Sequence, residues 1–455
     1  MFFIFNKLKI SAGLNLFLIL SFILISCNGN QKNFNMPLKF RDIKTIVIKQ
    51  DTSQSYCIYL PVDYKNKKKW PVLFMFDSHG DGKFAIIHAK EAAERFGFIL
   101  VGSNNSKNGV ENIDHIVNVL FSDVFSHYSI NEKLVYTAGF SGGGRVASNI
   151  AISSSKIRGV ITCSAGLPQI NLQSINKRFE IFAIAGKEDF NYNEVESLDD
   201  ELNGTGWRYI ITSFDSGHVW PPVKYFTDAL LWFELNSMRD GLIPQDDKLL
   251  DETFDDITKD INQFLNNKQY AKADQECKKG ISYLFGLHKV SSFEDEREKL
   301  KESDGFKQDV LNQIRIDDKE KELRNNYMDK FFSADSDWWT NEIKSINANI
   351  SQNGDILSRQ MYSRVKGFLG IVCYSYTSKA IAANNIELSK KCMTIYEKLE
   401  PKNPDLYFYK ALLMDKANQP DKAVKLLKTA FDYGFTDKYK IRDMFSRNVQ
   451  KSLLH

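Results

Sequence analysis

The sequence has little net charge and few long apolar runs, which argues against nucleic-acid-binding and membrane-embedded proteins. Its formal net charge is only +3 over 455 residues, and two of the positive charges, Lys7 and Lys9, lie in the first 27 residues, which are described below. So balanced a chain has no electrostatic attraction for nucleic acid or for an anionic membrane surface. No second long apolar run follows residue 27, so we do not expect the body of the protein to span a bilayer.

Cysteines are also few, and none are spaced for a metal site. Six occur, and no two form a C-x-x-C pair: Cys27, Cys57, Cys163, Cys277, Cys373 and Cys392. If Cys27 belongs to the leader, the other five cannot all pair in disulfides. We therefore expect packed, reduced thiols, and we expect neither a metal nor an organic cofactor.

The first 27 residues have the pattern of an export leader. The positive stretch NKLKI precedes the charge-free run SAGLNLFLILSFILIS, which ends just before Cys27. An apolar run this short that ends at small residues is typical of a signal peptide. The ending Leu-Ile-Ser-Cys resembles a bacterial lipobox. That resemblance implies a lipid on Cys27, a membrane anchor and a place in the bacterial cell envelope, facing the periplasm or the exterior. An uncleaved N-terminal helix with an incidental cysteine is the alternative.

Residues 28–240 alternate between strand-like and helix-like segments. The strand-like runs are KTIVIKQ, YCIYLPV, WPVLFMFD, FILVGSN, KLVYTAG, GVITCSAG, FEIFAIAG and WRYIITSF. Several are apolar throughout, as expected of strands that are buried on both faces of a mostly parallel sheet. Alternation with helix-length segments predicts an α/β fold with helices on both faces of that sheet.

Residues 241–455 have helical patterns, and strand signals stop there. Two segments align when Ala383 is set against Ala417, 34 residues later, and small residues recur at Ala273, Ser389 and Ala423. The spacing resembles tetratricopeptide repeats, which implies an all-α domain of stacked helices with a concave face for a protein partner. An irregular helical domain remains the alternative.

The strand-like run KLVYTAG leads directly into a G-x-S-x-G pattern centred on Ser141, with Gly139 and Gly143 two residues to either side. In a strand–turn–helix context this pattern is typical of a nucleophile held on a tight bend. Glycines at these positions would allow the strand and the helix to approach closely. A flexible glycine-rich loop is the alternative.

A nucleophilic serine needs a base, and the base needs an acid that fixes its tautomer. Of seven histidines, His218 lies in a loop after the last predicted strand, at the edge where such sheets build their sites. Asp189 follows the preceding strand, FEIFAIAG, so the order is Ser141, Asp189, His218. Glu188 is a local competitor for the acid, whereas Asp215 is too near His218 in sequence to be favoured.

The transition state of acyl transfer also needs donors for its oxyanion. One is the backbone N–H of Gly142, and the second is expected from the loop SHGDG, at Ser78 or His79. Four further residues close to the site are candidates for lining the substrate pocket, although loop packing would explain them equally well. They are Phe140, Asn104, Asn105 and Trp220.

With these motifs placed, residues 70–235 resemble an α/β hydrolase of the polyhydroxybutyrate-depolymerase and feruloyl-esterase type. The matching pieces are FSDVFSHYSINEKLVYTAGFSGGGRVA, AGKEDFNYNEVESL and FDSGHVWPP. The resemblance implies a serine esterase whose substrate is a small-molecule or polymeric ester, such as an acylated carbohydrate or a polyester. Two features depart from the family: the oxyanion loop FDSHGDG and the appended helical half.

Two other functions stay open at this point. A peptidase or amidase would use the same triad. Alternatively, the protein is an inactive envelope binding protein whose helical repeats recruit a partner. The presence of Ser141, Asp189 and His218 together weighs against an inactive scaffold.

Overall fold

A computed structural model describes residues 40–168, 175, 177–352 and 354–454. These residues form two compact units, 40–375 and 376–454, and each is described by itself below. The predicted boundary near residue 240 falls inside the first unit. The leader with Cys27 lies outside the described residues.

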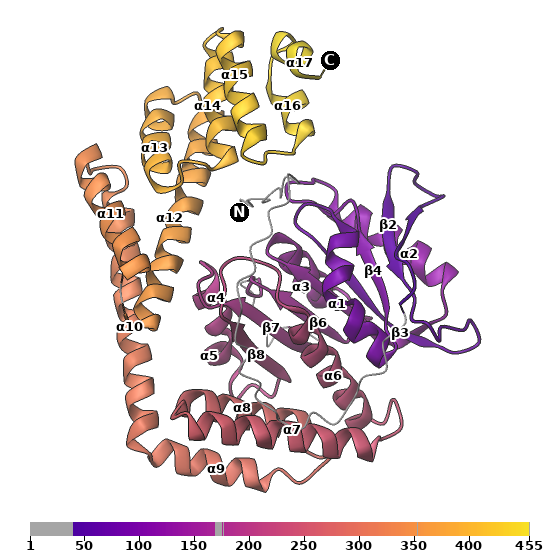
Figure 1. The fold of residues 1–455 in the computed structure, drawn as a ribbon. Helices are drawn as coiled ribbons and strands as arrows, with labels where there is room; N and C mark the ends of the chain where they lie inside the picture. The colour runs from indigo at the N-terminus through magenta and orange to yellow at the C-terminus, as the bar shows by residue number, and fades with distance from the viewer. Residues whose placement is uncertain (1–39, 169–174, 176, 353, 455) are drawn as a thin grey trace, which may run out of the picture. The chain divides into compact units, whose positions relative to one another are not determined.

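The first unit is built on one eight-stranded sheet in the order β1-β2-β4-β3-β5-β6-β7-β8 (Figure 1). Strands β3 to β8 are parallel, whereas β1 and β2 pair antiparallel at one edge. Each of the eight predicted runs is a strand. Their bounds are β1 (Lys44–Val47), β2 (Ser55–Tyr59), β3 (Trp70–Phe76), β4 (Ile99–Ser103), β5 (Ile130–Phe140), β6 (Gly159–Cys163), β7 (Glu180–Gly186) and β8 (Tyr209–Phe214).

Helices cover both faces of this sheet. They are α1 (Gly82–Phe96), α2 (Ile113–His127), α3 (Gly142–Ser153), α4 (Tyr192–Glu196), α5 (Leu198–Leu202) and α6 (Val223–Arg239). The apolar faces of α2, α3, α4 and α5 share one core with the sheet. Helices α1 and α6 pack together, and aromatic rings of α6 meet ring side chains of β5 and β7 on the opposite face. The predicted α/β-hydrolase fold, followed by an all-helical region, is confirmed.

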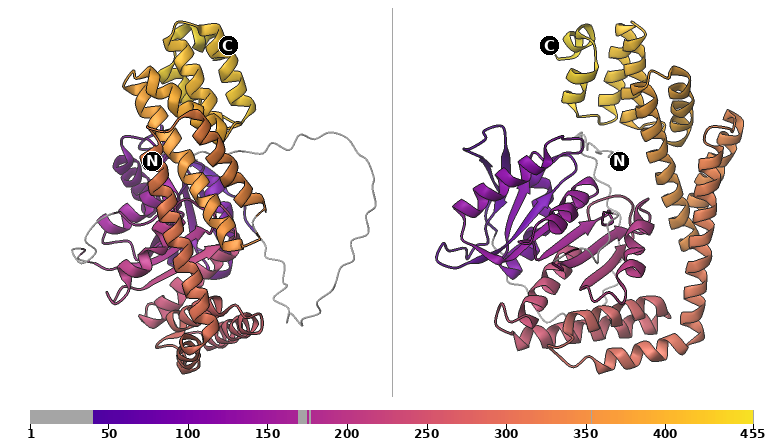
Figure 2. Two further views of the ribbon diagram at one scale, coloured as in Figure 1. Left: turned by 90° about the vertical axis from the view of Figure 1, so that its left-hand side faces the viewer. Right: turned by 180° about the vertical axis from the view of Figure 1, so that it is seen from behind.

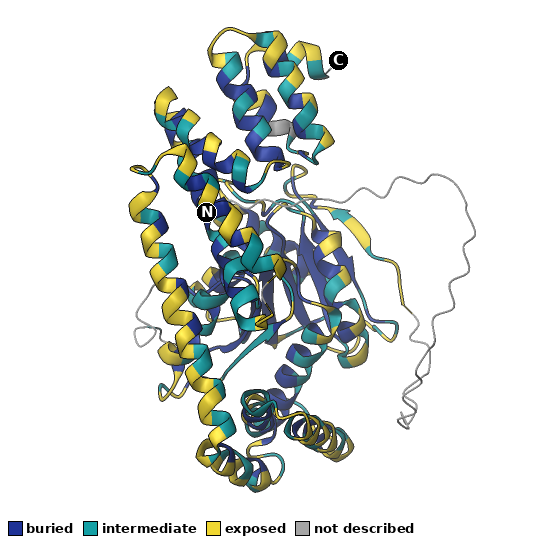
Figure 3. Cartoon of the chain, turned by 60° about the vertical axis from the view of Figure 1, so that its left-hand side comes forward, coloured by how far each residue is buried: buried dark blue, intermediate teal, exposed yellow. Residues whose placement is uncertain are grey.

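The strands are buried because their side chains are apolar on both faces, as the sequence pattern predicted. Strands β4, β6 and β7 have no exposed residue, and Figure 3 shows the sheet as a buried layer. Burial contributes about 25 cal/mol per Å² of apolar surface, so the burial of these strands stabilises the unit.

Six further helices complete the first unit: α7 (Asp247–Asn266), α8 (Tyr270–Leu284), α9 (Ser291–Glu302), α10 (Asp304–Lys330), α11 (Ser336–Gln352) and α12 (Ile356–Ala382), the last of which continues into the second unit. Helix α8 is tied to α6, because Tyr283 donates to the carbonyl of Asp228 and Trp232 donates to Ser282. Most of α10 is exposed (Figure 3), and it runs beside α12 in both views of Figure 2.

The second unit is all helical, with α13 (Ile386–Leu399), α14 (Pro404–Lys416), α15 (Pro420–Asp432), α16 (Lys438–Met444) and α17 (Arg447–Leu454). The turns before α13 and α15 are alike: Asn384 and Asn418, 34 residues apart, both have a φ near +55°. Lys268, before α8, has the same conformation. The predicted small residues Ser389, Ala423 and Ala273 are all fully buried. That these helices are tetratricopeptide repeats stays a prediction.

Five of the six cysteines lie in the described residues, and each is a buried thiol, as predicted. Burial raises the pKa of the Cys163 thiol well above its usual range, so this group is unreactive. Among the described residues, no helix is both long enough and apolar enough to cross a membrane.

Candidate active site

Ser141 stands on the bend between β5 and α3, where its backbone has φ 58° and ψ −120°. A residue other than glycine rarely adopts a positive φ, and the resulting backbone strain costs about 1–3 kcal/mol. The bend is fixed by a hydrogen bond from the Ser141 N–H to the carbonyl of Cys163 at 2.8 Å. The G-x-S-x-G pattern therefore forms the predicted strand–turn–helix, rather than a loose loop.

The glycines two residues from Ser141 are required by close backbone contact. A Cβ on Gly139 would lie 2.1 Å from the carbonyl oxygen of Gly143, and one on Gly143 would lie 1.9 Å from that of Phe76. Both distances are below any real contact, and the obstructing atoms are backbone. This confirms the prediction that these glycines allow the strand and the helix to approach.

The structure brings Ser141, His218 and Asp189 into one hydrogen-bonded chain. The His218 Nε2 lies 2.9 Å from the Ser141 Oγ, and its Nδ1 lies 2.9 Å from both carboxylate oxygens of Asp189. A carboxylate accepts, so Nδ1 carries the imidazole proton and Nε2 accepts from the serine hydroxyl. Ser141 and Asp189 are fully buried, whereas the His218 side chain is 10% exposed.

The acid and the histidine come from adjacent loops at the carboxyl ends of β7 and β8. The two loops are joined because the Glu188 N–H donates to the Ser216 carbonyl at 2.9 Å. The N–H of Asn191 donates to Asp189 Oδ1 at 2.8 Å, which adds a second donor to the carboxylate. This arrangement follows from parallel strand pairing, which places the ends of neighbouring strands at one edge of the sheet.

The two rival acids lie elsewhere. Glu188 is exposed, and Asp215 pairs with Lys187 at 2.9 Å with its side chain 68% exposed. A hydrogen bond from Lys187 is the largest cause that lowers the pKa of Asp215. Only Asp189, of the three carboxylates considered, therefore faces the histidine.

Aromatic rings enclose the imidazole of His218. Phe190 stacks on it with 4.3 Å between ring centroids, and Phe140 lies at 4.7 Å. Trp220 stacks in turn on Phe140 and on His88, at 5.5 and 5.0 Å. With these rings around it, only 10% of the His218 side chain is exposed, so the Ser141–His218 hydrogen bond lies in a medium of low polarity.

Of the predicted oxyanion donors, Gly142 is the first residue of α3, where backbone N–H groups have no partner within the helix. The N–H of His79 donates to Asp77 Oδ1 at 2.8 Å, so it is already engaged. Ser78 is buried, and its carbonyl accepts from the N–H of Asn108 at 2.8 Å. Of the two residues predicted to give the second donor, Ser78 is the one whose N–H is not bonded to Asp77, and its role as donor stays a prediction.

Asp77 organises this loop as a buried anion. Besides the His79 N–H, it accepts from the indole Nε1 of Trp220 at 3.0 Å. Burial alone would raise the pKa of Asp77, but the interactions with His79 and Trp220 outweigh it and hold the pKa below its usual value. Trp220 is 8% exposed, so most of its ring serves packing.

The amides of Asn104 and Asn105, predicted to line a pocket, are occupied by structural hydrogen bonds. Asn104 accepts from the Gly82 N–H at 3.1 Å and donates to Ser55 at 3.0 Å. Asn105 accepts from the Ser55 N–H at 2.9 Å and donates to the carbonyl of Ser53. These contacts tie the end of β4 to the start of β2, which is the alternative role considered for them.

Two residues at the site could not be identified from the sequence. Asn108 packs closely against Gly142: a Cβ added at Gly142 would lie 1.8 Å from the Oδ1 of Asn108. It is one of four asparagines between residues 103 and 112, and nothing in the sequence distinguishes it. Phe190 adjoins Asp189, but only the fold shows that its ring faces His218.

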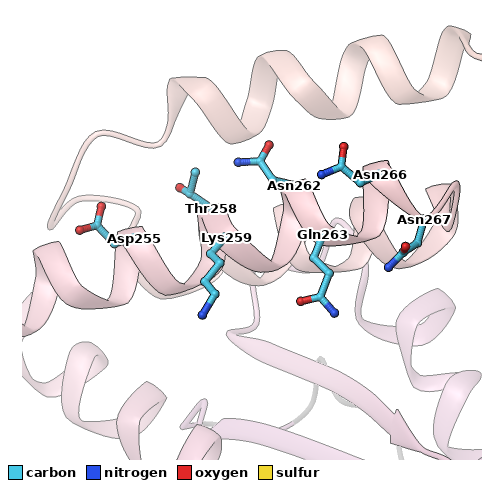
Figure 4. A pocket seen from close by; sticks show the side chains of 7 residues that line it. All are labelled: Asp255, Thr258, Lys259, Asn262, Gln263, Asn266 and Asn267. Atoms are coloured by element: carbon cyan, nitrogen blue, oxygen red, sulfur yellow. The ribbon is translucent and has the colours of Figure 1, made fainter. Parts of the chain in front are cut away.

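Two surface hollows were considered as candidate binding sites. One of about 640 Å³ is lined only by polar side chains of α7 and of Asn267, which follows it, and Figure 4 shows these side chains pointing in different directions. Another, of about 590 Å³, lies beside Trp220 and includes Ile87, His88 and Val219. Among the described residues, no group of side chains is arranged to hold a metal ion.

Comparison with known proteins gives distant structural likenesses only. No family model and no curated sequence matches the chain. A ferulic acid esterase is 18% identical, covering 42% of this chain and 96% of its own, with a TM-score of 0.34. The feruloyl esterase module from Clostridium thermocellum, complexed with sinapinate, is 18% identical over 43% of this chain and 88% of its own, with a TM-score of 0.36. An S-formylglutathione hydrolase from Staphylococcus aureus is 16% identical over 42% and 98%, with a TM-score of 0.34.

Proposed function

We propose that the chain is a serine hydrolase that cleaves carboxylic esters through an acyl-enzyme. The observation that supports this most strongly is the hydrogen-bonded chain from Ser141 through His218 to Asp189, with 2.9 Å at each step. A buried serine on a strained bend, bonded to a histidine that is bonded to a buried carboxylate, has the geometry of an activated nucleophile.

In the proposed reaction, Ser141 Oγ attacks the ester carbonyl while its proton passes to Nε2 of His218. The Asp189 carboxylate stabilises the imidazolium that forms. The backbone N–H groups of Gly142 and Ser78 bind the oxyanion. His218 then gives its proton to the departing alcohol, and water, activated by the same base, releases the acid and restores the hydroxyl of Ser141.

The proposed substrates are either acylated carbohydrates or polyesters, as the sequence resemblance implies. The same triad chemistry is open to amides, so an amide series belongs in the first substrate screen. Faster turnover of amides than of matched esters would assign the protein to the peptidase and amidase class instead.

Labelling with a fluorophosphonate probe tests the proposal. Wild-type protein is expected to be labelled, whereas Ser141→Ala and His218→Ala are not, because the first lacks the nucleophile and the second lacks its base. Loss of a triad member is expected to lower turnover of an activated ester by about 10⁴-fold or more. Ser126→Ala, which removes an α2 hydroxyl bonded to the carbonyl of Asp123, is the matched control. Absence of labelling in folded wild-type protein would favour the inactive binding protein.

We further propose that the C-terminal helices are tetratricopeptide-like and bind a protein partner. The 34-residue recurrence of the turns at Asn384 and Asn418 and of the buried small residues Ser389 and Ala423 supports this. Stacked helical repeats present extended concave surfaces, which suit a protein or peptide ligand.

Lipidation at Cys27 and an envelope location remain proposals from the leader sequence. Incorporation of a labelled fatty acid into the wild type, and its absence from Cys27→Ser, would verify the anchor. Incorporation in both proteins would show that Cys27 is not the lipid-bearing residue.

A further inference from the structure

The loop that carries Asp189 is held from outside the hydrolase fold. This acid loop, residues 187–191, presents two backbone carbonyls to helices far along the chain. The carbonyl of Lys187 accepts from Arg364 Nη1 at 2.8 Å, and that of Phe190 accepts from Arg324 Nη2 at 3.2 Å. The two carbonyls flank Asp189, so the arginines hold the acid loop on either side of the carboxylate.

One carboxylate orients both arginines. Glu320, on α10, is fully buried; its Oε2 accepts from Arg364 Nε at 2.7 Å, and its Oε1 lies 2.5 Å from Arg324 Nη2. We call Glu320, Arg324 and Arg364 the clamp. Burying the ionised pair of Glu320 and Arg364 is costly, and apolar side chains would join two helices at less cost. In the clamp, each planar guanidinium can pair with Glu320 and at the same time donate a hydrogen bond to one backbone carbonyl of the acid loop.

Charge and burial agree with this geometry. Arg364 is 2% exposed, and its guanidinium lies 4.8 Å from the ring of Tyr192, at the start of α4. Burial lowers the pKa of Arg324, while the carboxylates of Glu320 and Asp189 act in the opposite direction. The clamp carries one more positive charge than negative, and that excess lies close to the Asp189 carboxylate.

A second contact of α12 is with Phe190, the residue whose ring stacks on His218. Gly367, one turn beyond Arg364 on α12, lies against Phe190: a Cβ at Gly367 would be 3.2 Å from Phe190 Cδ1. The same ring stacks on the imidazole of His218, at 4.3 Å between ring centroids. Helix α12 therefore contacts the acid loop at two points, the carbonyl of Lys187 and the ring of Phe190.

We propose that Arg324 and Arg364 are positioning residues of the active site, which hold the acid loop so that Asp189 faces Nδ1 of His218. The hydrolase fold is then completed by helices α10 and α12, through arginines that are more than 130 residues from Asp189 along the chain. The inference rests on the proposed function, since it assigns these arginines to the hydrolysis carried out by that triad.

The test compares Arg324→Met and Arg364→Met with wild type on p-nitrophenyl acetate. Misplacing a catalytic group by about 1 Å can cost about 10²-fold, so we expect kcat to fall about 10- to 100-fold. KM should change little, because neither arginine is expected to touch substrate. Arg364→Lys keeps the charge but loses the planar fork, so its kcat should be intermediate.

Arg297→Met is the matched control. Arg297, on α9, also bonds a buried carboxylate at 2.8 Å, but that carboxylate is Asp274 of α8 and not a residue of the clamp. The Arg297→Met substitution should lower the melting temperature, but kcat measured on the folded protein should stay at the wild-type value. An equal fall of kcat in Arg297→Met would show that the clamp variants act through general destabilisation, which would overturn the proposal.

A readout that needs no turnover separates this inference from the proposed function. The proton shared by His218 Nδ1 and Asp189 is expected to give a far-downfield NMR signal. That signal should shift or broaden in Arg324→Met, whose side chain is partly exposed, and stay in Arg297→Met. A wild-type protein that neither reacts with fluorophosphonate nor cleaves esters would refute the proposed function alone. Unchanged kcat and an unchanged signal in both clamp variants would refute the clamp.

Discussion

Single carboxyl groups in this protein differ widely according to their surroundings, and Glu196 is an example. It ends α4, close to the acid loop, and burial raises its pKa from 4.5 to about 7. The negative charges of Asp199 and Asp317 add to the rise, and Lys187 and Lys278 oppose it. The folded protein therefore prefers the neutral form of this group.

Glu196→Gln is expected to stabilise the protein, and by more as the pH rises. A raised folded-state pKa contributes stability that is complete below about pH 4.5 and is lost as the pH rises through about 7. Glutamine stays neutral, so the gain in melting temperature over wild type should grow between pH 5 and 7 and then level off.

Differential scanning calorimetry from pH 5 to 8 would measure this gain. The control is Glu201→Gln, at an exposed carboxyl of α5, which should show no such trend. A gain for Glu196→Gln that is constant over the whole range would contradict the raised pKa of this carboxyl.

At the scale of elements, the strand–turn–helix around Ser141 was predictable because its sequence signal is local. The strand run, the serine and the spaced glycines all lie within residues 133–145. The contact that excludes a Cβ at Gly139 is made inside that segment, whereas the one at Gly143 is made with Phe76 on β3. The acid loop is different. Its inner contacts come from β8, but its outer contacts come from α10 and α12.

The clamp gave no usable signal in the sequence. Glu320 and Arg324 are four residues apart, which is a common spacing for ion pairs on exposed helical faces. Most of α10 is indeed exposed, so its pattern predicts a solvated helix. Only the side-by-side packing of α10 and α12 buries Glu320 and brings Arg364 to it.

At the scale of the whole molecule, the first compact unit reaches residue 375 and so includes the clamp. Truncation after Ala382, the end of α12, is expected to keep ester hydrolysis within about threefold of the full chain, since no contact of the clamp is removed. Truncation after Gly241 is expected to abolish it, because the clamp and the α8 contacts to α6 are lost.

Both truncated proteins retain Ser141, Asp189 and His218, so they form a matched pair. Turnover of p-nitrophenyl acetate and far-ultraviolet circular dichroism would be measured on each. Full activity after Gly241 would show that the α/β part is independent of the helices. Loss of activity in a folded protein that ends at Ala382 would assign a catalytic role to the second unit.

The sequence by itself determined the sheet, the order of the strands along the chain and the identity of the hydrogen-bonded serine, acid and histidine. Those features follow from local periodicity and from the rule that parallel strands end at one edge. Only the tertiary structure decided that His79 N–H is engaged by Asp77, that Asn108 packs on Gly142, and that α10 and α12 reach the acid loop. These contacts join residues distant along the chain, and their side chains carry no local pattern because their environment exists only once the elements have packed.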